Sequence, residues 1–276
     1  MIKINKICLL WLVFITTIGF FVLRTLVVLA GYNPDSNSFF FAMTRILPLM
    51  VLVLHADFTL GPKKTTIFIV TSAAIGLLFE LVGVNFGVVF GTHYIYKQSL
   101  LMVGPIPLVI PLFWAAFIYL GYSITNLLLL FSGREKLSSK NSSFITILLA
   151  VFLDGLLVTS IDLLLDPIEV SRGAWQWIEG GPYFGIPLSN FLGWFIVSSL
   201  SSLLFRVYEY NNSSIFYSRD KIMTQLIPVA GFILLMISYI IDSLILKKPE
   251  LAMIGLFISL PIVLSCFILL ATKNNT

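Results

Sequence analysis

The sequence predicts an all-α integral membrane protein, a polytopic bundle of about eight transmembrane helices. Of the 276 residues, 58% are hydrophobic and only 11% are charged, whereas an average soluble domain has about a quarter charged residues. So few charges cannot cover a water-facing surface. This composition excludes a soluble globular enzyme, a disordered chain and a nucleic-acid-binding domain. Two cysteines are too few for a disulfide framework.

Eight apolar stretches are long enough to cross a bilayer, because each transmembrane helix needs about 20 mostly apolar residues. They are residues 7–30, 39–60, 65–84, 108–131, 144–165, 186–205, 222–246 and 251–271. The first has a basic start, as a signal peptide does, but its apolar run is long and lacks a small-x-small cleavage site, so we expect a retained helix. No Gly/Ser linker divides the chain, so residues 1–276 are predicted to form a single membrane domain.

The lysines and arginines predict the orientation. With the N-terminus in the cytoplasm, eleven of them fall in inner segments and four in outer segments, and Arg24 and Arg45 lie within or at the ends of spans. The inner residues are Lys3, Lys6, Lys63, Lys64, Arg134, Lys136, Lys140, Arg206, Arg219, Lys221 and Lys273, and the outer ones are Lys97, Arg172, Lys247 and Lys248. This positive-inside bias predicts a multi-pass protein of the cell membrane with both termini in the cytoplasm.

The fifth stretch carries three carboxylates, Asp154, Asp162 and Asp166. An intramembrane carboxylate costs roughly 2.5 kcal/mol or more, so each one calls for a reason. Asp162 and Asp166 are four residues apart and share one helix face. Asp154 lies about 80° round the helix from Asp162 and two turns deeper. Glu80, near the outer end of the third stretch, reaches a depth similar to that of the aspartate pair.

These positions predict that Glu80, Asp162 and Asp166 form a cluster that opens toward the outer side. The alternative is that the acids pair with Arg24, Arg45 or His93 and only pin helices together. Asp57 and Asp242 lie near helix ends and are predicted to be solvated or interfacial. Two histidines are too few for a His-based metal site, although a Mg²⁺ site made of carboxylates alone stays open.

Two outer loops, residues 83–96 and 166–194, mix glycines with aromatic rings. An aromatic belt at the membrane interface accounts for part of the rings. It does not account for the interleaved glycines and prolines, which favour close and irregular backbone packing, as in a re-entrant loop that caps a cavity.

The same segments resemble the prokaryotic carotenoid biosynthesis membrane-protein family, whose characterised members are carotenoid hydratases of the bisanhydrobacterioruberin and γ-carotene hydratase types. The resemblance covers roughly residues 55–205. It is carried by Glu80-Leu-Val-Gly83, Phe90-Gly91, Tyr94-Ile-Tyr96, Pro107 to Trp114, Asp162 through Asp166-Pro167, Trp175, Trp177 and the block from Tyr183 to Trp194.

The resemblance implies an enzyme that adds water across the terminal double bond of an acyclic (ψ) carotenoid end group to give a tertiary alcohol. Its partners would be the carotenoid, water and membrane lipid. Such a reaction needs a protonated carboxyl group, a second carboxylate for the water and aromatic faces beside the cation. It needs no redox or nucleotide cofactor, and the sequence has no Gly-rich phosphate loop to hold one.

On this hypothesis the catalytic residues are drawn from Asp162, Asp166, Glu80 and Asp154. Asp162 or Asp166 donates the proton, and Glu80 or the remaining aspartate accepts one from water. The candidate substrate-binding residues are His93, Tyr94, Tyr96, Trp175, Trp177, Tyr183, Phe184, Asn190 and Trp194. Two other functions stay open at this point: another isoprenoid reaction, such as cyclisation or isomerisation, and a proton-coupled transporter or lipid-binding protein.

Overall fold

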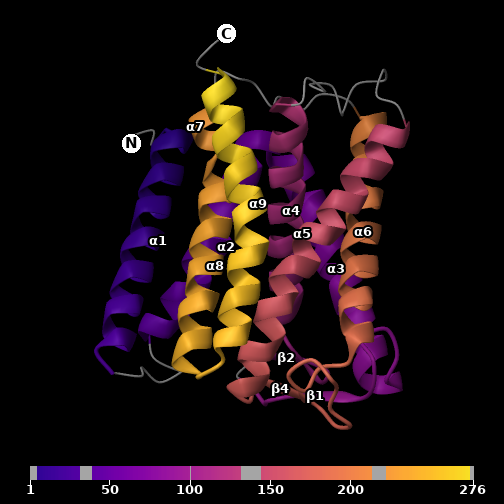
Figure 1. Ribbon diagram of the computed structural model, residues 1–276. Coiled ribbons are helices and arrows are strands. Elements are labelled where there is room, and N and C mark those ends of the chain that lie inside the picture. The colour runs from indigo at the N-terminus through magenta and orange to yellow at the C-terminus, as the bar shows by residue number, and fades with distance from the viewer. Residues whose placement is uncertain (1–4, 32–38, 100, 132–143, 213–221, 274–276) are drawn as a thin grey trace.

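The computed structural model describes residues 5–31, 39–99, 101–131, 144–212 and 222–273 (Figure 1). Residues 132–143, between the fourth and fifth predicted spans, lie outside the described residues. Within them the helices are α1 (Lys6–Leu29), α2 (Phe39–Leu60), α3 (Pro62–Phe86), α4 (Val109–Phe131), α5 (Phe144–Ser171), α6 (Leu188–Asn211), α7 (Ile222–Gln225), α8 (Ile227–Ile245) and α9 (Pro249–Lys273).

Seven of the described helical segments are long and apolar enough to cross a membrane: α1 to α6, and α7 together with α8. The 25-residue α9 is also largely apolar. The predicted all-α membrane bundle is therefore confirmed. The seventh predicted helix is interrupted between α7 and α8 because Pro228, in the first turn of α8, has no N–H to continue the helical hydrogen bonds.

Two helices run further than the sequence predicts. α5 continues past residue 165 to Ser171, so Asp166 and Pro167 lie inside the helix rather than in the following loop. α6 continues past residue 205 to Asn211 and therefore includes Arg206, which is buried. Arg206 therefore no longer counts among the basic residues of the inner segments. Ten lysines and arginines remain in the predicted inner segments, against four in the outer segments. The side of the membrane on which the termini lie stays a prediction.

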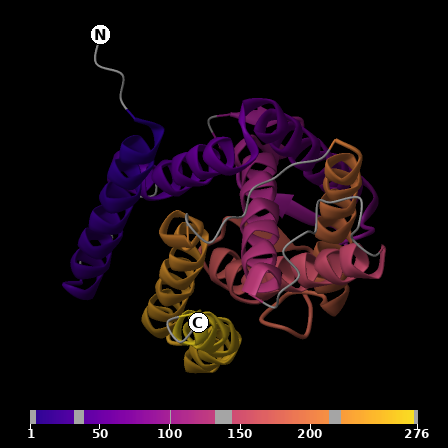
Figure 2. The ribbon, with the colours of Figure 1, turned by 90° about the horizontal axis from the view of Figure 1, so that it is seen from above.

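The helices form a core of four, α3 to α6, with α4 packed against most of the others. Figure 2 shows α1 with α2 and α8 with α9 as pairs outside this core. α1 begins and α9 ends at the same end of the bundle, and the segments that join α3 to α4 and α5 to α6 lie at the opposite end (Figure 1).

These two connecting segments form a cap that includes short strands, which the sequence analysis missed. β1 (Tyr94–Tyr96), from the first segment, pairs antiparallel with β4 (Trp175–Trp177), from the second. β2 (Met102–Val103) and β3 (Ile106–Pro107) form a separate hairpin. The cap thus joins two parts of the chain that are far apart in sequence and sets them over the ends of the core helices.

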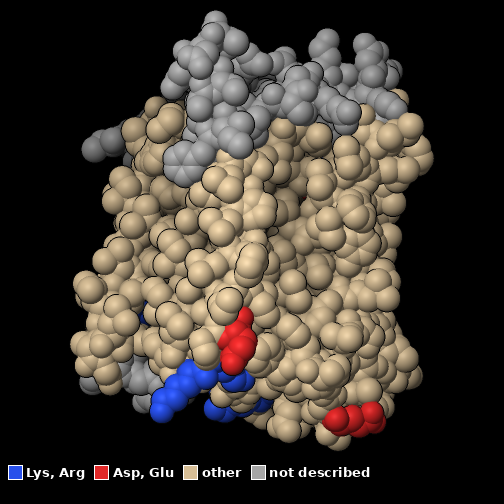
Figure 3. Space-filling view, in the orientation of Figure 1, with Lys and Arg blue, Asp and Glu red and all other residues tan. Residues whose placement is uncertain are grey.

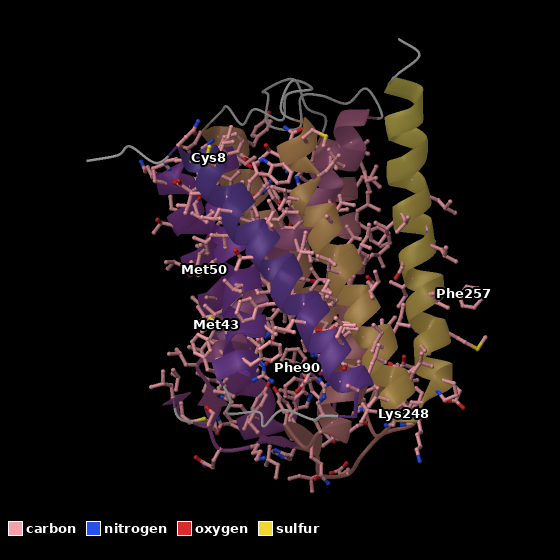
Figure 4. All side chains as sticks on the ribbon, turned by 90° about the vertical axis from the view of Figure 1, so that its left-hand side faces the viewer. Cys8, Met43, Met50, Phe90, Lys248 and Phe257 are labelled. Atoms are coloured by element: carbon pink, nitrogen blue, oxygen red, sulfur yellow. The ribbon has the colours of Figure 1, made fainter. Side chains whose placement is uncertain are left out.

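The outer surface suits a lipid environment. On the face that Figure 3 shows, the visible charged side chains lie near the cap end, and the rest of the described surface on that face is uncharged. Figure 4 shows Phe257 of α9 pointing away from the bundle, where its side chain is 72% exposed. Phe90, at the cap end of the same view, is 2% exposed.

Candidate active site

Glu80, in the last part of α3, is buried and accepts hydrogen bonds on both carboxylate oxygens. Tyr94 Oη and Tyr96 Oη donate to Oε2 over 2.7 and 2.8 Å. Trp114 Nε1 of α4 donates to Oε1 over 2.9 Å. Three donors from β1 and α4 therefore converge on one carboxylate at the cap end of the core.

The hydroxyl groups of Tyr94 and Tyr96 stay protonated and can therefore donate these hydrogen bonds to Glu80. Burial raises the pKa of Tyr94 and Tyr96 well above the ordinary value of 10, and the neighbouring Glu80 carboxylate raises both further. Hydroxyls that stay protonated act as donors to an adjacent carboxylate.

Trp114 reaches Glu80 because α3 has a glycine one turn earlier. A Cβ atom at Gly76 would lie 2.4 Å from Trp114 Cγ. Any larger residue would displace the indole, so the bare backbone at this position fixes the depth at which the Trp114 N–H meets the carboxylate.

Asp162 and Asp166 of α5 meet at Asn190 in the first turn of α6. Asn190 Nδ2 donates to Asp162 Oδ2 over 2.8 Å and to Asp166 Oδ2 over 2.6 Å, and all three residues are at most 2% exposed. Trp175 Nε1 of β4 donates to Asp166 Oδ1 over 3.1 Å. One amide nitrogen therefore reaches an oxygen of each carboxyl group, and two buried carboxyl groups held this close favour a state in which they share one proton.

A cavity of about 30 Å³ lies between Glu80 and Asp166. Its polar lining consists of Glu80, Tyr94, Tyr96, Asp166, Trp175 and Asn190, and its apolar lining of Phe90, Ile110, Phe113, Trp114, Phe117, Leu165, Trp177 and Trp194. The Trp114 and Trp194 rings stack with centroids 4.2 Å apart. This volume suits one or two water molecules and is too small for an isoprenoid end group without side-chain movement.

The cap packs onto the helix ends through glycines, as the sequence predicted. A Cβ atom at Gly193 of α6 would lie 2.5 Å from the carbonyl oxygen of Val89. Gly91, whose φ of +104° disfavours other residues, would place a Cβ atom 2.6 Å from Pro187 Cβ. Trp177 Nε1 donates to the carbonyl of Phe90 over 2.9 Å and ties the two loops together.

Five of the candidate residues lie outside the cavity lining: Asp154, Asp162, His93, Tyr183 and Phe184. Asp154 of α5 forms a buried ion pair with Arg206 over 2.7 Å and accepts a hydrogen bond from Ser202. His93 is exposed, with its ring near the carbonyl of Val84. Tyr183 and Phe184 pack edge to face on each other.

Asp162 also contributes no surface to the cavity and contacts it through Asp166 and Asn190. Of the four acids, Glu80 and Asp166 therefore face the cavity directly. Asp154 fits the alternative in which an acid forms an ion pair and only holds helices together. Its partner is Arg206 rather than Arg24, Arg45 or His93.

Asp242 was expected to be solvated or interfacial near a helix end, and its burial shows that it is not solvated. It is 3% exposed and pairs with Arg24 over 2.6 Å and with Arg172 over 2.8 Å. α1 crosses close enough to α8 for Arg24 to reach it, a helix contact that sequence periodicity does not reveal. Asp57 agrees better with the expectation, since it is half-buried and pairs with the exposed Lys6.

Trp114 lines the site but was not among the predicted site residues. The signal was present in the spacing of Ile110, Trp114 and Phe117, which places all three on one face of α4. Among the described residues, no group of three or more His, Cys, Asp and Glu side chains is arranged as metal ligands.

Comparison with known proteins places these features in a family. A family model described as "Carotenoid biosynthesis protein" matches residues 40–262, a range that extends the resemblance from α2 into α9 and contains every residue that lines the cavity. The bisanhydrobacterioruberin hydratase of Haloarcula japonica is 26% identical over 179 residues, which are 63% of this chain and 57% of that protein. The match thus spans just over half of that relative's length. No solved structure matches the chain. The chain belongs to the carotenoid biosynthesis protein family.

Proposed function

We propose that the chain is a carotenoid hydratase, a carbon–oxygen lyase that adds water to the terminal double bond of an acyclic (ψ) end group. The product is a tertiary alcohol. The observation that carries the proposal is that two buried carboxyl groups, Glu80 and Asp166, line one small cavity whose remaining walls are largely aromatic. The name of the Haloarcula japonica relative, a carotenoid hydratase, supports the same chemistry.

An isolated trisubstituted alkene is hydrated by protonation, which creates a tertiary cation that water then captures. Protonation needs a carboxyl group that still holds its proton, and the buried pair of Asp162 and Asp166, which Asn190 bridges, offers one. The cation is stabilised by the negative faces of aromatic rings, at about 0.5 to 2 kcal/mol for each ring. Trp114 and Trp194 lie within the lining of the same cavity.

The membrane location agrees with a substrate that dissolves in lipid. A carotenoid lies in the hydrocarbon core of the bilayer, and the acids lie in helices that span it. The end group would enter between the helices beneath the cap and displace the aromatic side chains that close the cavity.

The test is expression of the chain in a host that accumulates lycopene, followed by mass spectrometry of the pigments. A hydratase adds the mass of one water for each modified end, and the new hydroxyl group is tertiary. A cyclase or isomerase leaves the mass unchanged. A host that expresses Asp166→Asn at the same membrane level should make at least about 100-fold less product. Unaltered lycopene in cells that contain the wild-type protein would refute the proposal.

A further inference from the structure

The hydrogen bonds around the cavity distinguish its two carboxyl groups. Glu80 is surrounded by donors, because Tyr94, Tyr96 and Trp114 all direct an O–H or N–H at its oxygens. This arrangement matches a carboxylate, which only accepts hydrogen bonds. A neutral Glu80 would have to direct its own O–H at one of these donors.

Asp166 has a different environment. It accepts from Trp175 and Asn190, and the Asn190 amide holds it beside the buried Asp162 carboxyl. Asp162 Oδ1 receives no hydrogen bond from the N–H and O–H groups of the described residues. Two buried carboxyl groups this close, one with an oxygen that no donor reaches, favour a state in which the pair holds one proton. The cavity thus has a carboxylate on one wall and a proton-holding pair on the other.

The space between the walls fits water. Its volume of about 30 Å³ exceeds the roughly 10 to 15 Å³ that one buried water requires. A water in this space meets the Glu80 carboxylate and the Tyr94 and Tyr96 hydroxyls on one side and Asp166 on the other. These groups supply the two to four polar partners that a buried water needs.

We infer that this cavity binds the reacting water against Glu80, which acts as its base, and that Asp166 is the proton donor to the alkene. The inference rests on the proposed function. The proton of the Asp166 carboxyl adds to the less substituted alkene carbon, whose π electrons form the new C–H bond. The water oxygen bonds to the resulting tertiary cation, and its released proton goes to Glu80. Return of that proton through cavity water to Asp166 restores the starting state, so no proton is consumed overall.

The assignment predicts that the two acids fail in different ways. Without the base, the cation still forms, but it loses a proton from an adjacent carbon and returns to an alkene. In D₂O this return leaves deuterium on carbon in the recovered substrate. Without the proton donor, neither hydration nor deuterium uptake occurs. Membranes that contain each variant would be incubated with lycopene in D₂O, and both hydrated product and deuterium in recovered lycopene would be measured by mass spectrometry.

For Glu80→Gln we expect hydration to fall at least about 100-fold while deuterium still enters the recovered lycopene. For Asp166→Asn we expect both signals to fall at least about 100-fold. Asp57→Asn, the same chemical change at the ion pair on the far side of the molecule, should leave both signals unchanged. In Glu80→Asp the shorter side chain withdraws the carboxylate from the water. The ratio of deuterium uptake to hydration should therefore rise, whatever the amount of folded protein.

The assignment is overturned if Asp166→Asn takes up deuterium without hydrating. It is equally overturned if Glu80→Gln, present in the membrane and monodisperse in detergent, loses both signals, or if the ratio in Glu80→Asp does not rise. Failure of the proposed function looks different, because the wild-type protein itself would then give no hydrated lycopene.

Discussion

The phenol of Tyr183 donates a hydrogen bond to the carbonyl oxygen of Leu163 over 2.9 Å. Pro167, four residues after Leu163 in α5, has no N–H and leaves this carbonyl without its helical partner. A cap residue thus replaces the missing hydrogen bond on the turn that carries Asp162 and Asp166. Tyr183, expected to line the cation pocket, supports the helix that holds the acids.

Replacing Tyr183 by Phe should therefore weaken the fold rather than the chemistry. The lost hydrogen bond is worth about 1 kcal/mol, and the unfolding temperature in detergent should fall by a few degrees. The turnover of the folded fraction should stay close to that of the wild type. A loss of turnover without a loss of stability would instead place the phenol at the substrate.

The contribution of Tyr183 to the free energy of unfolding should decrease at high pH. Burial, together with the charge of Asp162, raises the pKa of Tyr183 from 10 to about 12. A raised pKa means that the folded state holds the phenol proton more tightly. The stability difference between the wild type and Tyr183→Phe should be complete below pH 10 and disappear as the pH rises through about 12. Thermal unfolding of both proteins over this range would check the sign, and a difference that grows with pH would contradict it.

Asn190 should behave as a positioning residue, because its amide bridges the two aspartates. Asn190→Leu preserves the size of the side chain and removes both hydrogen bonds. We expect kcat to fall at least about tenfold with little change in KM, since misplacing a catalytic group slows the chemical step. Asn85→Leu, at an exposed position of α3 where the amide bonds the carbonyl of Leu81, is the matched control and should keep full activity.

Gly76→Ala should act on Glu80 through Trp114. The added methyl group would meet the indole at 2.4 Å and displace it from the carboxylate. Overpacking of this kind costs about 1 to 3 kcal/mol, so both stability and activity should fall. Gly19→Ala on α1 has no neighbouring atom within 4 Å of the new methyl and should change neither. Tryptophan fluorescence would report whether the Trp114 environment changes.

The ion pair of Asp154 and Arg206 should be structural. Arg206→Met leaves the Asp154 carboxylate buried without its partner, which costs about 3 to 5 kcal/mol. The double variant Asp154→Leu with Arg206→Met should recover much of this stability and remain active, because Asp154 lies outside the cavity. A double variant that is folded but inactive would contradict this prediction and indicate that Asp154 takes part in the reaction.

The sequence predicts the helices and the depth of the acids well because both depend on local patterns. Apolar runs of the length of a bilayer define the spans, and a spacing of four residues puts Asp162 and Asp166 on one face. The predicted positions of the helix ends were less accurate. Asp166-Pro167 looks like a helix terminus, but Tyr183 satisfies the carbonyl that Pro167 leaves free, so α5 continues to Ser171.

The cap strands show only a weak alternation signal in the sequence. Tyr94-Ile95-Tyr96 and Trp175-Gln176-Trp177 each place a polar or exposed residue between two rings, as a strand with one buried face does. Three residues are too few for a reliable period, and the pairing of the two strands depends on contacts between distant segments. The same limit applies to Asp242, whose partner Arg24 lies on α1.

The pairing of β1 with β4 also determines when the site can form during synthesis. Tyr94 and Tyr96, which hold Glu80, are translated before the helices α4 and α5, and Trp175, which holds Asp166, follows them. Both loops have to reach the same side of the membrane before the strands can pair. A nascent chain that stops before Trp175 therefore has Glu80 but no closed cavity, so the site is completed late in membrane insertion.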